Sequence, residues 1–200
     1  MQIPRPRFSI IAAVLFLAMP WLQGCTAGGV AVGAGATAGV AAYQERGLTA
    51  AVKDAKITAQ VIDAMFRHNN TLNLIIGVET YEGRVLLTGS VKDPKHRADA
   101  VRLAWTVAGV RDVINEIQVN PDSGVVDLAK DTWITAQLQY TLTFDKEILA
   151  INYVVETVNG VVYLIGIAQD RRELDRVKAH AANISYVRRV VSHVRIKGAT

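Results

Sequence analysis

The sequence predicts an α+β protein built from two small duplicated domains, each with the element order helix, strand, strand, helix, strand. A shift of 77 positions superimposes residues 54–119 on residues 131–196 without a gap, with about 18 identities. Within each copy the apolar period changes between the helical and the two-residue spacing in the same order. Each copy has only about 65 residues, so we expect a marginal core and expect the copies to stabilise each other by packing.

Two helices are predicted in each copy, covering one face of its sheet. Asp54 is a candidate N-cap of the first helix, and Asp93 followed by Pro94 begins the second. In the later copy, Asp170 and Glu173 have the spacing of a capping box. Helical periodicity predicts as core residues Ile57, Val61, Met65, Ala100, Leu103, Ala104 and Val107 in the first copy, and Leu174, Val177, Ala181 and Ile184 in the second.

Three strands are predicted in each copy. The runs NLIIGVET and RVLLTG, and later YVVET and VVYLIG, are apolar and rich in β-branched residues. The second pair is joined by Asn159-Gly160, which favours a type I′ hairpin because both central residues of that turn need positive φ. Gly83 holds the equivalent place in the first copy. The alternating runs DVINEIQV and RVVSHVRI predict a half-buried last strand.

The helix predicted between Lys130 and Phe144 has two apolar faces, whereas a surface helix normally has one. One row has the spacing of a core face and consists of Ile134, Leu138 and Leu142. The other row lies well over a quarter-turn away and consists of Trp133, Gln137, Tyr140 and Phe144. The second row therefore needs a partner other than the core of its own domain.

The first copy acts as an internal control for the aromatic row. At the positions of Trp133, Tyr140 and Phe144 it carries, in the same order, Lys56, Asp63 and Arg67. The fold therefore does not require aromatic residues there. Two interpretations remain open: the row is an exposed binding surface, or it is buried against the first copy or a connecting segment.

The N-terminus has the features of a lipoprotein signal peptide over residues 1–24. Arg5 and Arg7 precede an apolar stretch that ends in LQGC, which resembles the lipobox of bacterial lipoproteins. The resemblance implies acylation of Cys25, and Thr26 after it favours the outer membrane. An ordinary cleaved signal or an uncleaved anchor is the alternative.

Two connecting segments are predicted. Residues 25–53 form a Gly/Ala-rich tether after the lipidated cysteine, either a flexible spacer or a segment that packs at the membrane. Residues 121–129, which contain Pro121 and Gly124, form the linker between a first domain at 54–120 and a second at 130–197.

The composition excludes several classes of function. Removing residues 1–24 leaves 20 basic residues against 18 acidic ones, which is too balanced for a general nucleic-acid binder. Cys25 is the only cysteine, so neither an intrachain disulfide nor a thiolate metal cluster can form. The glycines lie in turns or in the tether, not in a phosphate-binding loop, and the four histidines lack metal-ligand spacing. We therefore expect no enzyme activity, no cofactor and no metal.

The duplicated pattern resembles BON domains. The resemblance rests on the hairpin glycines, the second strands closed by Gly89 and Gly166, and the entry to the last strand at Gly109-Val110 and Tyr186-Val187. Two such copies behind a lipobox resemble the dual-BON outer-membrane lipoproteins of Gram-negative bacteria. The resemblance implies that each domain has a three-stranded mixed sheet, and that the second domain binds anionic phospholipid through its first helix.

These observations predict an outer-membrane lipoprotein that faces the periplasm and supports envelope integrity. The expected lipid-binding residues are Lys130, Trp133, Ile134, Gln137, Tyr140 and Phe144. The second copy also has an excess of basic residues, which could add to this surface or form an ordinary solvated face. These residues are Arg171, Arg172, Arg176, Lys178, Arg188 and Arg189. The alternative function is an adaptor for an outer-membrane assembly protein or a cell-wall partner.

Overall fold

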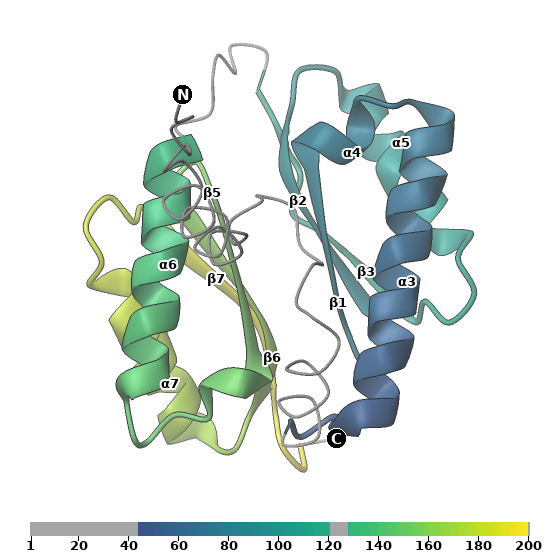
Figure 1. Cartoon of the computed structure of the whole chain (residues 1–200). Helices are drawn as coiled ribbons and strands as arrows, with labels where there is room; N and C mark the ends of the chain where they lie inside the picture. Colours follow the sequence, from purple (N-terminus) through teal and green to yellow (C-terminus); the bar gives the residue numbers. More distant parts are fainter. Residues whose placement is uncertain (1–43, 121–127, 200) are drawn as a thin grey trace, which may run out of the picture. The chain divides into compact units, whose positions relative to one another are not determined.

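The computed structural model describes residues 44–120 and 128–199, and all of these lie in one compact unit. The predicted signal peptide, Cys25, the tether up to residue 43 and residues 121–127 of the linker lie outside the described residues. Figure 1 shows the two copies, each with helices on one face of a sheet.

The first copy follows the predicted element order. Its elements are α3 (Gly47–His68), α4 (Leu72–Ile75), β1 (Ile76–Tyr81), β2 (Arg84–Val91), α5 (Pro94–Trp105), β3 (Asp112–Asn115) and β4 (Gln118–Val119). Strand β2 pairs antiparallel with β1 and parallel with β3 and β4. The sheet is therefore mixed, with β2 in its centre.

The second copy repeats this topology. Its elements are α6 (Leu128–Phe144), the short 3-10 helix η1 (Ala150–Asn152), β5 (Tyr153–Val158), β6 (Val161–Ala168), α7 (Arg171–Ala182) and β7 (Arg189–Ile196). Strand β6 pairs antiparallel with β5 and parallel with β7. The predicted α+β fold class, with a mixed sheet and two principal helices in each domain, is confirmed.

Some predicted boundaries differ from the observed ones. The run from Asn73 to Ile75, predicted as strand, belongs to α4, and Leu128 and Ala129, predicted as linker, belong to α6. The last strand of the first copy is divided into β3 and β4. At this break the Asn115 side chain accepts the N–H of Ile117 at 3.2 Å, so a side chain replaces a ladder partner.

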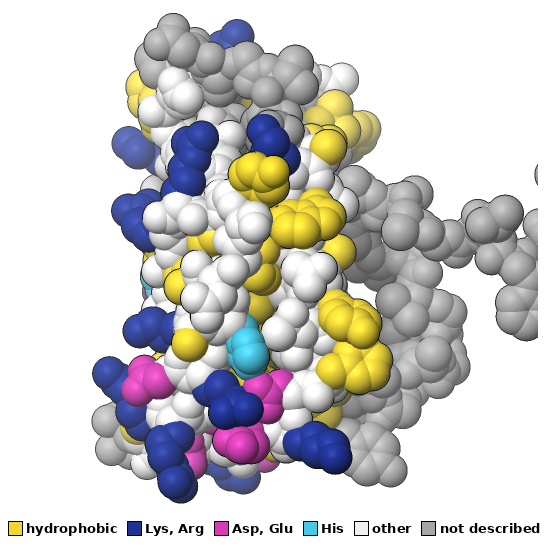
Figure 2. All heavy atoms as spheres, turned by 90° about the vertical axis from the view of Figure 1, so that its left-hand side faces the viewer, with side chains coloured by type: hydrophobic (Ala, Val, Ile, Leu, Met, Phe, Trp, Pro, Cys, Tyr) yellow, Lys and Arg dark blue, Asp and Glu magenta, His cyan; other side chains and the backbone are white. Residues whose placement is uncertain are grey.

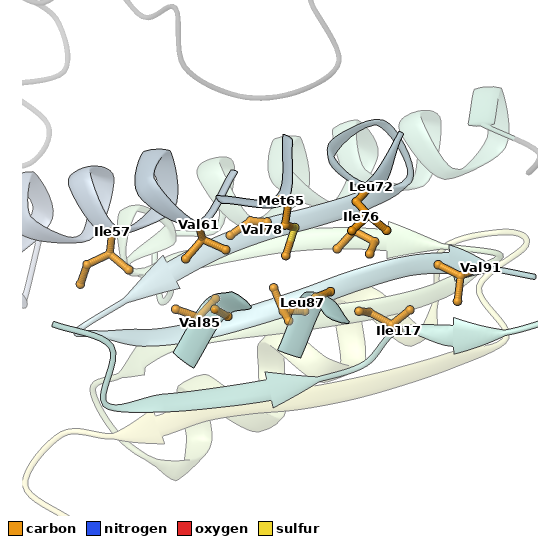
Figure 3. Close-up of a cluster of buried hydrophobic side chains, with 12 residues drawn as sticks. Ile57, Val61, Met65, Leu72, Ile76, Val78, Val85, Leu87, Val91 and Ile117 are labelled. Atoms are coloured by element: carbon orange, nitrogen blue, oxygen red, sulfur yellow. The ribbon is translucent and has the colours of Figure 1, made fainter. Parts of the chain in front are cut away.

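Each pair of helices covers an apolar core on one face of its sheet. In the first copy α3 directs Ile57, Val61 and Met65 toward Val85 and Leu87 of β2 (Figure 3). The helical core residues predicted from the sequence lie in these two clusters, either buried or partly buried. Because this core takes up one face of each sheet, the other face needs separate cover.

The opposite faces of the two sheets pack against each other. They share an apolar cluster that contains Tyr81, Leu86, Val161, Tyr163, Ile165 and Ile167. Polar groups add to this contact: Gln118 accepts a hydrogen bond from the Asn159 amide at 3.0 Å and donates one to the Tyr163 hydroxyl at 3.2 Å. The expectation that the copies pack on each other is confirmed, and the contact uses the sheets, not the helices.

A buried aspartate joins the first helix of each copy to its hairpin turn. Asp54 accepts hydrogen bonds from the N–H groups of Glu82 and Gly83, both at 2.8 Å. Asp131 accepts from Asn159 at 2.7 Å and from Gly160 at 2.8 Å. The prediction of Asp54 as an N-cap is wrong, because α3 begins at Gly47 and Asp54 lies inside it.

Both hairpin turns place their two central residues in the left-handed region. Asn159 and Gly160 have φ values of 51° and 71°, as the type I′ prediction requires. Glu82 and Gly83 have φ values of 52° and 73°, although glutamate is an unusual residue at such a position. The aspartate that accepts both N–H groups stabilises this conformation in each copy.

Replacement of Asp131 by asparagine is expected to destabilise the protein by about 2 kcal/mol, because an amide group replaces an acceptor of two charge-assisted hydrogen bonds. Urea unfolding followed by circular dichroism measures the change. Asp175→Asn serves as the control, because Asp175 is an exposed residue of α7 whose pair with Arg171 spans 3.5 Å. Equal stability of the two variants would contradict the assigned role of Asp131.

Two equivalent glutamates, Glu79 and Glu156, lie on the strand faces that form the contact between the sheets. By strand alternation Glu79 shares the face of Tyr81, and Glu156 shares the face of Val154 and Val158. Burial raises the pKa of each carboxyl to about 7, and the charge of Glu156 adds to the rise for Glu79. The folded protein therefore holds these protons at a pH at which the unfolded chain has released them.

The pKa values of Glu79 and Glu156 are higher in the folded protein than in the unfolded chain. The free energy of unfolding should therefore fall as the pH rises from about 4.5 to above about 7. Glu79→Gln should therefore raise the free energy of unfolding by on the order of 2 kcal/mol at pH 8 and leave it nearly unchanged at pH 4.5. Thermal unfolding at the two pH values measures this, with the exposed Glu147→Gln as control. A gain of the same size at both pH values would argue against a buried, protonated Glu79.

Candidate functional site

The inner face of α6 holds this helix against the second sheet. Ile134, Leu138 and Leu142 are buried, as the spacing predicted. The Thr135 hydroxyl donates to the Thr157 hydroxyl of β5 at 2.8 Å. The assignment of Ile134 to the lipid-binding set is wrong as far as its side chain is concerned, because it is 0% exposed and packs in the core.

The outer face of α6 leaves its aromatic side chains in solvent. Trp133 is 45% exposed, Tyr140 62% and Phe144 69%. Gln137, between them on the same face, is also exposed. Figure 2 shows this side of the molecule, with hydrophobic side chains at the surface, basic side chains beside them and acidic ones confined to its lower part. The alternative that the row is buried against the first copy is therefore wrong.

The exposed rings form two pairs along the helix. The ring centroids of Trp133 and Tyr186 lie 6.1 Å apart in an edge-to-face arrangement, and those of Tyr140 and Phe144 lie 4.6 Å apart. Phe144 follows Trp133 by eleven positions on the helix, which corresponds to about 16 Å along the axis. The pairs together make an elongated apolar strip, here called the aromatic strip, flanked by polar side chains.

Tyr186 belongs to the aromatic strip although it was not among the predicted site residues. It lies in the loop before β7 and has a positive φ of 69°, a conformation that glycine adopts more readily. Its equivalent in the first copy is Gly109, with φ 96°. A large side chain where the duplicate has glycine was the signal in the sequence that could have identified it.

At the positions of the strip the first copy has charged side chains. Asp63 and Arg67 form an ion pair at 2.7 Å on α3, where α6 has the ring pair of Tyr140 and Phe144. Lys56 takes the place of Trp133. The same backbone position is therefore an ordinary solvated surface in one copy and an apolar one in the other.

Basic groups lie at the Trp133 end of the strip. The Lys130 ammonium lies 5.6 Å from the centre of the Tyr186 ring. Arg188 follows two residues after Tyr186, and its side chain lies beside the hairpin turn at Gly160. Among the described residues, Arg188 has no ion pair. This end of the strip therefore carries two basic side chains, Lys130 and Arg188.

Most of the basic side chains on α7 form ion pairs with acidic neighbours. Arg171 pairs with Asp175 at 3.5 Å, and Arg172 with Asp170 at 3.7 Å. These two arginines fit the alternative of an ordinary solvated face. Of the two alternatives left open by the sequence, an ordinary solvated face therefore applies to Arg171 and Arg172.

At the other end of the strip, Asp145 follows Phe144 and binds two side chains of α7. Its carboxylate accepts a hydrogen bond from Arg176 at 2.6 Å and lies 2.6 Å from the His180 ring nitrogen. Arg176 and His180, in this order of effect, hold the pKa of Asp145 well below its usual range. The charge of this carboxylate is thus compensated, and it does not make this end of the strip strongly acidic.

Metal-binding clusters and membrane-spanning helices are absent from the described residues. Within residues 44–120 and 128–199, no group of three or more potential ligands could hold a metal ion. None of the helices in these ranges has the length and apolar character needed to cross a membrane.

The comparisons with known proteins agree with the duplication. The family model described as "BON domain" matches residues 53–121 and 130–198, which confirms the resemblance predicted from the sequence. The "Uncharacterized protein in gshII 5'region" of Anaplasma centrale is 38% identical over 147 residues, which cover 73% of this chain and 96% of that protein.

Two further relatives carry names that concern the cell envelope or osmotic stress. The "Outer membrane lipoprotein DolP" of Haemophilus influenzae is 30% identical over 184 residues, covering 90% of this chain and 92% of that protein. The "Osmotically-inducible protein Y" of Escherichia coli is 30% identical over 146 residues, covering 72% of this chain and 73% of that protein. The similarity to the Haemophilus influenzae lipoprotein covers 184 residues and therefore extends beyond the two repeats.

Proposed function

The chain belongs to the BON domain family, with two copies in tandem, and we propose that it is a non-enzymatic lipoprotein of the bacterial outer membrane. It faces the periplasm, binds anionic phospholipid through the outer face of α6, and supports the integrity of the envelope. The observation that carries this proposal is the aromatic strip, which is exposed on α6 and absent from the duplicate helix α3.

The aromatic strip has the chemistry of a membrane interface. Trp133, Tyr140 and Tyr186 each combine an apolar ring with a polar group, which suits the boundary between head groups and acyl chains. The strip runs along the helix axis, so α6 would lie flat on the surface with its inner face still packed on the sheet. The fold need not open for this contact.

The preference for anionic lipid follows from the charges at one end of the strip. The Lys130 ammonium lies 5.6 Å from the centre of the Tyr186 ring, and Arg188 follows Tyr186 by two residues in the same loop. Each basic side chain near an anionic surface contributes on the order of 1 kcal/mol, so this contribution is modest and sensitive to salt. The rings and the basic groups together are expected to give weak binding.

Weak binding is sufficient if the chain is already anchored. The predicted lipobox places acyl chains on Cys25, and a relative over 90% of this chain is named an outer membrane lipoprotein. Two or more acyl chains confine a protein to the membrane surface. A second contact then acts at high effective concentration, and α6 would orient the domains on the membrane more than recruit them.

The decisive experiment replaces Trp133 by glutamate in the chain from Thr26 onward, which retains every described element. Sedimentation with phosphatidylglycerol vesicles should fall by about tenfold, because the variant loses an interfacial ring and gains a negative charge. Phe66→Glu is the matched control, since it changes an aromatic residue of α3 that is 56% exposed and lies outside the strip. Equal sedimentation of the two variants would contradict lipid binding by α6.

A crosslinker at position 133 in cells distinguishes lipid from protein as the partner. Lipid adducts support the proposal. One discrete crosslinked protein band would instead favour the alternative function, an adaptor for an outer-membrane assembly protein or a cell-wall partner.

A further inference from the structure

The first copy has an open groove at the place where the second copy carries Trp133 and Tyr186. The groove has a volume of about 630 Å³ and lies between the first half of α3, the β1–β2 turn and the loop before β3. Gly109 lines it without a side chain, whereas its equivalent in the second copy is Tyr186. The two copies therefore have equivalent sites, which are open in the first copy and filled by aromatic side chains in the second.

The groove contains three basic side chains that no acidic group compensates. Lys53 and Lys56 lie one helical turn apart on α3, and Arg111 lies on the opposite wall. The Arg111 N–H donates to the Gly83 carbonyl at 2.8 Å, which fixes this residue beside the hairpin turn. In the described part of the chain none of the three has an ion pair or a side-chain hydrogen bond.

The acidic groups that line the groove are already engaged. Asp54 accepts hydrogen bonds from Arg46 and from the two turn N–H groups, and Glu82 is paired with Arg195. Arg46, the remaining basic residue of the lining, is held by Asp54 and by the carbonyl of Thr80 at 3.1 Å. The charged side chains of the groove that remain available to a ligand are consequently the basic ones, Lys53, Lys56 and Arg111.

We propose that this groove binds the phosphate group of a small anionic ligand, either a free phosphate ester or the head group of a lipid. Two lysines supply mobile positive charges, and the planar guanidinium of Arg111 can bind a phosphate through two parallel hydrogen bonds. Ile57, Ala50 and Ala108 line the remainder of the groove with apolar groups. The ligand is therefore defined by its phosphate group, for which glycerol 3-phosphate is a small representative ester.

The proposal is independent of lipid binding by α6. Lys53 and Lys130 are equivalent, as are Arg111 and Arg188, so both copies keep the basic residues at the edge of the site. In the second copy two rings occupy the space between them, and in the first copy that space is open. One copy thus has an apolar surface contact, and the other has a binding groove for a polar anion.

The test is an NMR titration of the chain from Thr26 onward that carries Trp133→Glu, so that the proposed α6 contact is weakened. Inorganic phosphate, glycerol 3-phosphate and phosphatidylglycerol vesicles are added separately, with chloride at equal ionic strength as the reference. Saturable shifts of the amide signals of Gly83, Gly109 and Arg111 are expected with a phosphate-bearing probe. Shifts with the soluble esters alone identify a free ligand, and shifts or broadening with vesicles identify a lipid head group.

Two variants locate the binding. Lys56→Gln combined with Arg111→Gln should weaken the affinity at least about fivefold. Gly109→Tyr should block the groove; Gly109 has φ 96°, where a side chain is strained, whereas Tyr186 has the equivalent place at φ 69°. Lys95→Gln combined with Arg97→Gln, on the exposed face of α5, is the charge-matched control and should bind like the parent.

Absence of saturable shifts with all three probes would overturn the proposal, as would shifts that survive the substitution of Lys56 and Arg111. Unchanged signals from the second copy show that the variants are folded. Because inorganic phosphate and glycerol 3-phosphate offer no membrane surface, the outcome with these two probes does not depend on whether α6 binds lipid.

Discussion

A buried carboxylate in the first helix of each copy, bound to two N–H groups of the hairpin turn, is the interaction on which the rest of the structure depends. Asp54 and Asp131 connect elements that are 28 and 29 residues apart in the chain. The bond fixes both the rotation of the helix about its axis and its position along the sheet. It thereby determines which side chains of α3 and α6 face the core and which face solvent.

The packing of the sheets leaves the helices available for function. In a single copy of this size one sheet face would remain uncovered, and the apolar cluster around Tyr163 and Leu86 covers both at once. The outer faces of α3 and α6 then carry no structural requirement. The ion pair of Asp63 and Arg67 and the ring pair of Tyr140 and Phe144 therefore hold equivalent positions in the same fold.

Much of the fold followed from local patterns. The repeat, the cap at Asp93, the Asn159-Gly160 turn and the core rows of the helices were predicted because each depends on residues close in the chain. The start of α3 was missed because Asp54 resembles a cap, while its partners lie in a turn that only the folded chain brings near. Tyr186 was missed as a site residue for the same reason, since its contact with Trp133 crosses from a loop to a helix.

The sequence by itself determined the two domains, their element order and the two apolar faces of α6, because periodicity and duplication are properties of the chain. Tertiary structure decided which face was buried, since exposure depends on what packs against each element. It also decided the charge of the surface: arginines that appear free in the sequence, such as Arg171 and Arg172, are paired with acids, whereas Lys53, Lys56 and Arg111 converge on a groove. Ion pairing and convergence depend on distances through space, and these arise only when the chain folds.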